Sequence, residues 1–150
     1  MHLLLAQIAE AENNREEKRK RLELFSSAAH EPRYGDMYNK YIALLEAEEF
    51  SNAEKAIEIA QREISNRPTP QSYDLLAWGY LQHGNKKGAL TIAQQYVENR
   101  TYEPDAMYHL AMIYHANGMN HEAQHYFETA SLSSFELGPS ITRQIDKYLN

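Results

Sequence analysis

The chain has 150 residues, of which 43% are hydrophobic and 24% charged, with a formal net charge of -6. This composition is typical of one globular domain with a continuous core, and its acidic balance argues against a nucleic-acid partner. The sequence contains no cysteine, which excludes disulfides and thiolate metal sites.

Two helices are expected in the first 33 residues, over 1–12 and 15–29, separated by a break at Asn13-Asn14. The second helix begins with a mixed charge run over 15–21. That run is either a basic docking strip or a solvated helix face with ion pairs between residues four apart, which is the commoner case.

The next two helices are expected over 35–47 and from Ala53 to Ile64. His30-Glu31-Pro32 separates this pair from the first, because the residue before a proline avoids helical geometry. Ser51 followed by Glu54 has the spacing of a capping box, which predicts that Ser51 caps the second helix of the pair.

The second half of the chain repeats itself at a spacing of 34 positions. The matching pairs are Leu76 and Leu110, Ala77 and Ala111, Tyr80 and Tyr114, Gly84 and Gly118, and Ala89 and Ala123. Small residues let helices cross closely, and glycine permits the turn between them. We expect helices over 70–83, 86–99, 104–116 and 120–133, followed by a short capping helix over 140–149.

A 34-residue period with this spacing resembles the tetratricopeptide repeat, a helix-turn-helix unit. The resemblance covers residues 34–137 and implies an all-α fold, a right-handed superhelical solenoid. The expected divisions of this single domain are a degenerate repeat (1–33), three repeats (34–69, 70–103 and 104–137) and a capping helix (139–150). The segments 73–78, 105–109 and 134–135 are similar to uncharacterised bacterial repeat proteins, which provide no function to transfer.

The resemblance implies that a protein or peptide partner binds in the concave groove formed by the first helix of each repeat. The groove residues expected from the family's positions are Tyr38, Ile42, Asp74, Trp78, Leu81, Asp105, Tyr108, Met112 and His115. No Lys, Arg or Asn occupies these positions, which argues against the carboxylate clamp of the family's chaperone-binding members. An aromatic and apolar groove with acidic spots favours a hydrophobic peptide or helix, with a basic residue as a further complement. Alternatively, Trp78 and Tyr108 pack between repeats.

Histidines suggest two kinds of chemistry. His121 and His125 lie four positions apart on one expected helix, as two metal ligands would, although solvated histidines are the commoner outcome. His109 beside Tyr108, with Asp105 one turn earlier, suggests an acid–base pair or an interior histidine satisfied by hydrogen bonds. No phosphate loop or nucleophile motif is present, so we expect a non-catalytic protein without a cofactor.

The apolar edge formed by Leu3, Leu4, Leu5 and Ile8 supports a second hypothesis, in which two copies assemble through it or it joins further repeats. No run approaches the roughly 18 apolar residues of a membrane span. The short apolar start has no basic leader, so a cytoplasmic location is expected. A segment of an exported protein would have the same features.

Overall fold

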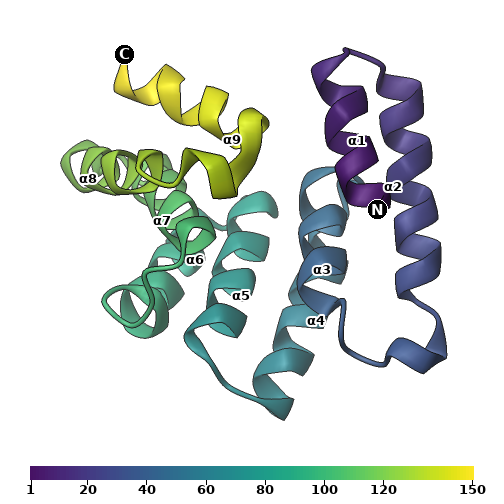
Figure 1. Cartoon of the computed structure of the whole chain (residues 1–150). Helices are drawn as coiled ribbons and strands as arrows, with labels where there is room; N and C mark the ends of the chain where they lie inside the picture. Colours follow the sequence, from purple (N-terminus) through teal and green to yellow (C-terminus); the bar gives the residue numbers. More distant parts are fainter.

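The structure, a computed structural model, describes all 150 residues and is entirely helical. Antiparallel helix pairs lie side by side from the N-terminal hairpin onward, and the last helix crosses one end of the row (Figure 1). The helices are α1 (His2–Ala11), α2 (Arg15–Ala29), α3 (Asn39–Glu48), α4 (Ala53–Asn66), α5 (Pro70–Gln82), α6 (Lys86–Ile92), α7 (Pro104–Ala116), α8 (Asn120–Ser131) and α9 (Ser134–Leu149). A 3-10 turn, η1 (Pro32–Tyr34), precedes α3, and a π-helical segment, η2 (Ala93–Val97), extends α6.

Asparagine side chains begin three of the helices. The side-chain oxygens of Asn14, Asn52 and Asn85 each accept a hydrogen bond from the backbone N–H three residues later, at 3.1, 3.4 and 2.9 Å. The predicted cap at Ser51 is therefore wrong: Asn52 holds the cap of α4, and Ser51 lies before it with a φ of 54°. The capping box occurs instead between Thr69 and Ser72, at the start of α5.

Three expected helix boundaries differ from the structure. The helix predicted over 35–47 starts only at Asn39, because Gly35 has a φ of 51° and the chain turns before it. The helix predicted over 86–99 changes to π geometry at Ala93. The last helix begins at Ser134 but is interrupted at Gly138, whose φ of 81° and ψ of 171° suit only glycine.

The main hydrophobic core runs from the end of α2 to α9. Phe127, Leu110, Ile113, Ile145 and Val97 are its largest fully buried side chains. Small residues occupy the positions where helices cross: Ala77, Ala89, Ala93 and Ala111 have no exposed surface. Gly79 in α5 also lies at a close helix crossing, where an added Cβ would lie 2.9 Å from Cγ1 of Ile57 in α4.

The two ends of the row are attached differently. The α1–α2 hairpin joins α3 through a small cluster formed by Ala6, Leu22 and Leu45, with Leu3, Phe25 and Phe50 packed around it. By contrast, α9 inserts Ile145, which is 1% exposed, and stacks Tyr148 on Phe127 with ring centroids 4.5 Å apart. Ser140 in α9 also donates a hydrogen bond of 3.4 Å to Glu10 in α1. No helix combines the length and apolar character required to cross a lipid bilayer.

Candidate functional site

A buried histidine–aspartate pair joins the α5 and α7 hairpins. His109 Nδ1 lies 2.8 Å from Asp74 Oδ2, and the two residues are 3% and 6% exposed. The imidazole also stacks on the indole of Trp78, with ring centroids 4.1 Å apart and an angle of 18° between the rings. Because buried polar groups require partners, this pairing satisfies a histidine that faces the interior.

The surroundings of His109 favour its charged form. Burial alone lowers the pKa of His109, but the charge and hydrogen bond of Asp74, followed by the charges of Glu48 and Asp105, raise the pKa above its ordinary value. A protonated imidazole against the face of Trp78 also gains a cation–π interaction. Asp74 therefore favours the protonated form of His109 in the interior.

Glu48 connects this interior network to the surface. Its Oε1 accepts a hydrogen bond of 2.9 Å from Trp78 Nε1, while the residue as a whole is exposed. Burial of the carboxylate raises the pKa of Glu48, and the charge of His109 and the hydrogen bond from Trp78 offset part of that rise. Burial, with the nearby charge of Glu48, also raises the pKa of Tyr108 to about 12.

A second ion pair connects α3 to α7. Lys40 Nζ lies 3.1 Å from Asp105 Oδ2, and both side chains are partly exposed. Burial lowers the pKa of Lys40, but the hydrogen bond and charge of Asp105 outweigh it, so that the pKa is raised. Together with Trp78–Glu48, this pair holds α3 in register with α5 and α7.

A cleft of about 260 Å³ lies between α1, α3 and the start of α9. Its apolar walls come from all three helices, for example Leu3, Leu44 and Ile141. Its carboxylates are Glu10, Glu48 and Glu49, and its other lining residues are Ala6, Gln7, Lys18, Leu22, Tyr41, Leu45, Leu137, Gly138, Pro139 and Ser140. We call this site the α1–α3–α9 cleft.

None of the nine groove residues expected from the repeat positions lines this cleft. Ile42, Asp74, Trp78 and Tyr108 are buried, Tyr38, Leu81, Asp105 and Met112 are partly buried, and His115 is exposed against Tyr148. The buried four are therefore packing residues rather than an open contact surface. The cleft uses a neighbouring face of α3 instead, through Tyr41, Leu44 and Glu48.

Part of this site was detectable in the sequence. Tyr41, Leu44 and Glu48 are spaced by three and four positions, so they share one face of α3. No feature of the sequence indicated that α9 would line the cleft, because its position depends on how the last helix packs against the others.

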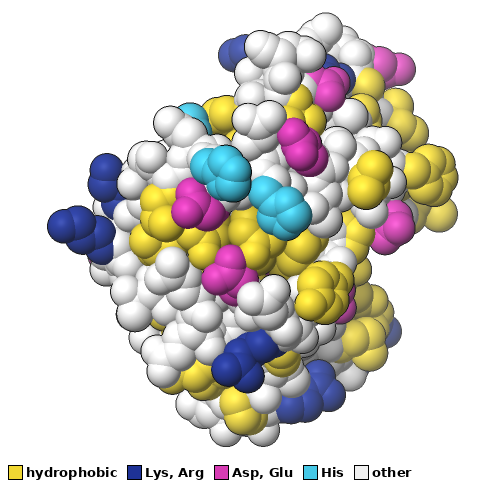
Figure 2. Space-filling model, turned by 90° about the vertical axis from the view of Figure 1, so that its left-hand side faces the viewer, with side chains coloured by type: hydrophobic (Ala, Val, Ile, Leu, Met, Phe, Trp, Pro, Cys, Tyr) yellow, Lys and Arg dark blue, Asp and Glu magenta, His cyan; other side chains and the backbone are white.

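The histidines expected as metal ligands lie on the side of the molecule that α8 forms. Figure 2 shows histidine and acidic side chains gathered on that side, around a band of hydrophobic surface. His121 and His125 are both exposed, and His125 packs edge-on against Tyr126 with ring centroids 5.2 Å apart. No group of three or more His, Asp or Glu side chains is placed to hold a metal ion. The acid–base pairing suggested for His109 and Asp105 is not formed, because His109 pairs with Asp74 and Asp105 with Lys40.

Comparisons with protein-family models, with curated proteins and with solved structures give no match. The function is therefore inferred from the chemistry of the cleft. An apolar cleft with carboxylates at its rim can accept an apolar group next to a positive charge.

Proposed function

We propose that the chain is a tetratricopeptide-repeat solenoid that binds a peptide or helix of a partner protein in the α1–α3–α9 cleft. The observation that carries the proposal is the lining of that cleft, which has apolar walls and one carboxylate, Glu48, that forms no salt bridge. The occupant would present an apolar side chain next to a lysine or arginine. This role is non-catalytic.

Equivalent positions of the 34-residue period support the repeat assignment. Gly84 and Gly118 have φ of 91° and 76° in the turns after α5 and α7. Ala77 and Ala111 are both 0% exposed where these helices pack against their neighbours. A spacing that recurs in both turn geometry and burial is what a repeated helix-turn-helix unit requires.

Charge complementarity decides the kind of occupant. Lys18 pairs with Glu10 and Glu49 at 3.1 and 2.8 Å, whereas Glu48 accepts only the indole hydrogen bond. A cation beside Glu48 would relieve the cost of its partial burial. Tyr41, which is 45% exposed, provides an aromatic contact at the same cleft.

The test measures binding of labelled amphipathic peptides that carry leucines with either one lysine or one glutamate. Glu48→Gln preserves an acceptor for Trp78, so the fold should be retained while affinity for the lysine peptide falls roughly tenfold. Tyr41→Ala should weaken binding of both peptides. The control, Glu54→Gln, removes an exposed carboxylate that forms no ion pair and should leave binding unchanged. Equal affinities for all four proteins would reject the cleft as the binding site.

Self-assembly is a second candidate because α1 exposes apolar side chains. Leu4 and Ile8, four positions apart, are 61% and 46% exposed on one face of this helix. A second copy of the chain could cover that face. The discriminating measurement is the mass of the protein in solution.

A further inference from the structure

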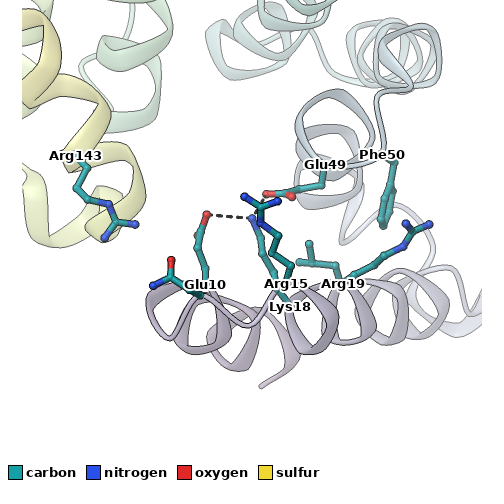
Figure 3. Close-up of a pocket in the computed structure, with 9 residues that line it drawn as sticks. Glu10, Arg15, Lys18, Arg19, Glu49, Phe50 and Arg143 are labelled. Atoms are coloured by element: carbon teal, nitrogen blue, oxygen red, sulfur yellow. Dashed lines mark hydrogen bonds and ion pairs between the residues drawn. The ribbon is translucent and has the colours of Figure 1, made fainter.

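A second concavity, of about 670 Å³, lies beside the cleft, between α2, the end of α3 and α9. Arg15 and Arg19 border it from α2, and Arg143 extends toward it from α9 on the other side (Figure 3). The remaining lining residues are Glu10, Asn13, Lys18, Leu22, Glu49 and Phe50. We call this site the arginine pocket.

The charged groups at the bottom of the arginine pocket form one ion-pair network. Lys18 Nζ lies 3.1 Å from Glu10 Oε1 and 2.8 Å from Glu49 Oε1. Burial lowers the pKa of Lys18, but hydrogen bonds and charges from Glu49 and Glu10 outweigh burial, so the pKa is raised. Lys18 therefore stays protonated and balances one of the two carboxylate charges.

The three arginines leave the pocket with an excess of positive charge. Arg15 and Arg143 form no ion pair or side-chain hydrogen bond, and Arg19 uses only Nε, at 3.0 Å from Glu23. The chain as a whole carries a net charge of -6, so this site reverses the sign of the surface. The lining as a whole has four cationic side chains and two carboxylates, so an anion in the cavity would be attracted.

A solvated helix face explains only part of the basic run in α2. Arg21 fits that reading, because its Nε lies 2.6 Å from Glu17 one turn earlier. Arg15 has no such partner, and Arg143 comes from the opposite end of the sequence to the same cavity. Unpaired guanidinium groups from two separate helices line one cavity, which indicates a site rather than a solvated strip.

We infer that the arginine pocket binds the phosphate group of a small phosphorylated molecule. Guanidinium groups match phosphate oxygens with paired, charge-assisted hydrogen bonds. The cavity volume falls in the range of small-molecule sites, and Leu22 and Phe50 offer an apolar wall for the rest of the ligand. The acidic chain as a whole would repel an extended polyanion, which separates this site from a nucleic-acid surface.

Titration calorimetry with inorganic pyrophosphate and with adenosine monophosphate, each at constant ionic strength, tests this inference. We expect saturable binding of one equivalent, weakened roughly tenfold or more in the Arg15→Gln/Arg143→Gln variant. The matched control is Arg62→Gln on α4, which removes an exposed arginine that forms no ion pair. It should bind like the parent chain.

A gain of affinity provides an independent check. Glu49→Gln removes one of the two carboxylates that neutralise Lys18, so phosphate binding should strengthen several-fold. A damaged fold cannot produce that result. The inference would be overturned by the absence of saturable binding, by equal loss in Arg62→Gln, or by a short single-stranded RNA that binds more tightly than both small phosphates. Failure of the peptide experiment leaves the phosphate-binding inference unaffected, because Arg15 and Arg143 do not line the cleft.

Discussion

At the scale of single residues, the buried pair of His109 and Asp74 is the most constrained feature of the molecule. An interior histidine satisfied by hydrogen bonds was one of the two sequence interpretations, without a named partner, and Asp105 was the partner only in the other, the acid–base pair. Asp105 lies one turn earlier on the same helix, whereas Asp74 comes from the neighbouring hairpin, 35 positions earlier. That separation is close to the 34-residue period, which brings nearly equivalent positions of adjacent hairpins together.

Asp74→Asn should change how stability depends on pH. In the parent chain the raised pKa of His109 stabilises the fold below the ordinary histidine pKa of about 6.5, and that contribution disappears as pH rises through the folded pKa. In the variant the charge and hydrogen bond of Asp74 are gone and only the charges of Glu48 and Asp105 oppose burial, so the pKa of His109 should fall and the stabilisation at acidic pH should be lost. At pH 6 we expect a loss of about 3 kcal/mol, measured by urea unfolding.

The control for this prediction is Asp146→Asn, which removes an exposed carboxylate on α9 that forms no ion pair. Trp78 is the only tryptophan and stacks on His109, so its emission reports the titration within the folded state. A protonated imidazole in contact with indole quenches its fluorescence. Parallel pH profiles of stability and of emission in parent and Asp74→Asn would contradict the proposed ion pair.

At the scale of helices, close crossings depend on small residues, and the sequence revealed most of them. The alanines repeated at 34 positions predicted the crossings at Ala77, Ala89 and Ala111, all of which are fully buried. Gly79 was not recognised, because it has no counterpart one period later, where Ile113 stands. Its importance comes from the position of Ile57 on α4, which the sequence of α5 does not contain.

Gly79→Ala should destabilise the protein although alanine favours helices. The gain in helix propensity is at most about 1 kcal/mol, whereas overpacking of a filled contact costs about 1–3 kcal/mol. The new Cβ would lie 2.9 Å from Ile57 Cγ1, with the Ile57 backbone nitrogen 3.5 Å away, so the neighbour has little room to move. Urea unfolding should show a lower midpoint. Gln82→Ala, at an exposed position of the same helix, should stay within about 0.5 kcal/mol of the parent. A stabilised Gly79→Ala protein would show that the α4–α5 contact is looser than described.

At the scale of the whole molecule, the helices could be predicted from the sequence, but the contact between the last helix and the first could not. Caps, prolines and the 34-residue period locate most helices to within a few residues, since these signals are local. The cleft, by contrast, combines α1 and α3 with α9, and Ser140 bonds to Glu10 across 130 positions. A repeat pattern describes contacts between neighbouring units only, so it contains no information about such a contact.

Solution mass tests whether the exposed face of α1 is covered by a second copy. If it is, light scattering after size exclusion should show a dimer that dissociates on dilution. Leu4→Glu with Ile8→Glu should give a monomer at every concentration, because buried carboxylates would oppose the contact. Ala11→Glu adds a charge at an exposed position of the same helix and should leave the dimer intact. A parent chain that is monomeric at millimolar concentration would reject self-assembly.

The unequal attachment of the two ends has a mechanical consequence. The row from α3 to α9 shares one large core, which α2 joins only at its C-terminal end through Ala29 and Phe25. The rest of the α1–α2 hairpin is held by the cluster of Ala6, Leu22 and Leu45, by the ion pair of Lys18 with Glu49 and by one hydrogen bond to α9. Such a hairpin opens at a lower free energy than the rest of the chain unfolds. The α3–α9 row is therefore the rigid part of the molecule, and the α1–α2 hairpin is the part that moves most easily. Both cavities lie between this hairpin and the rest of the chain, so their width changes when the hairpin moves. A ligand that contacts both sides would restrict that movement.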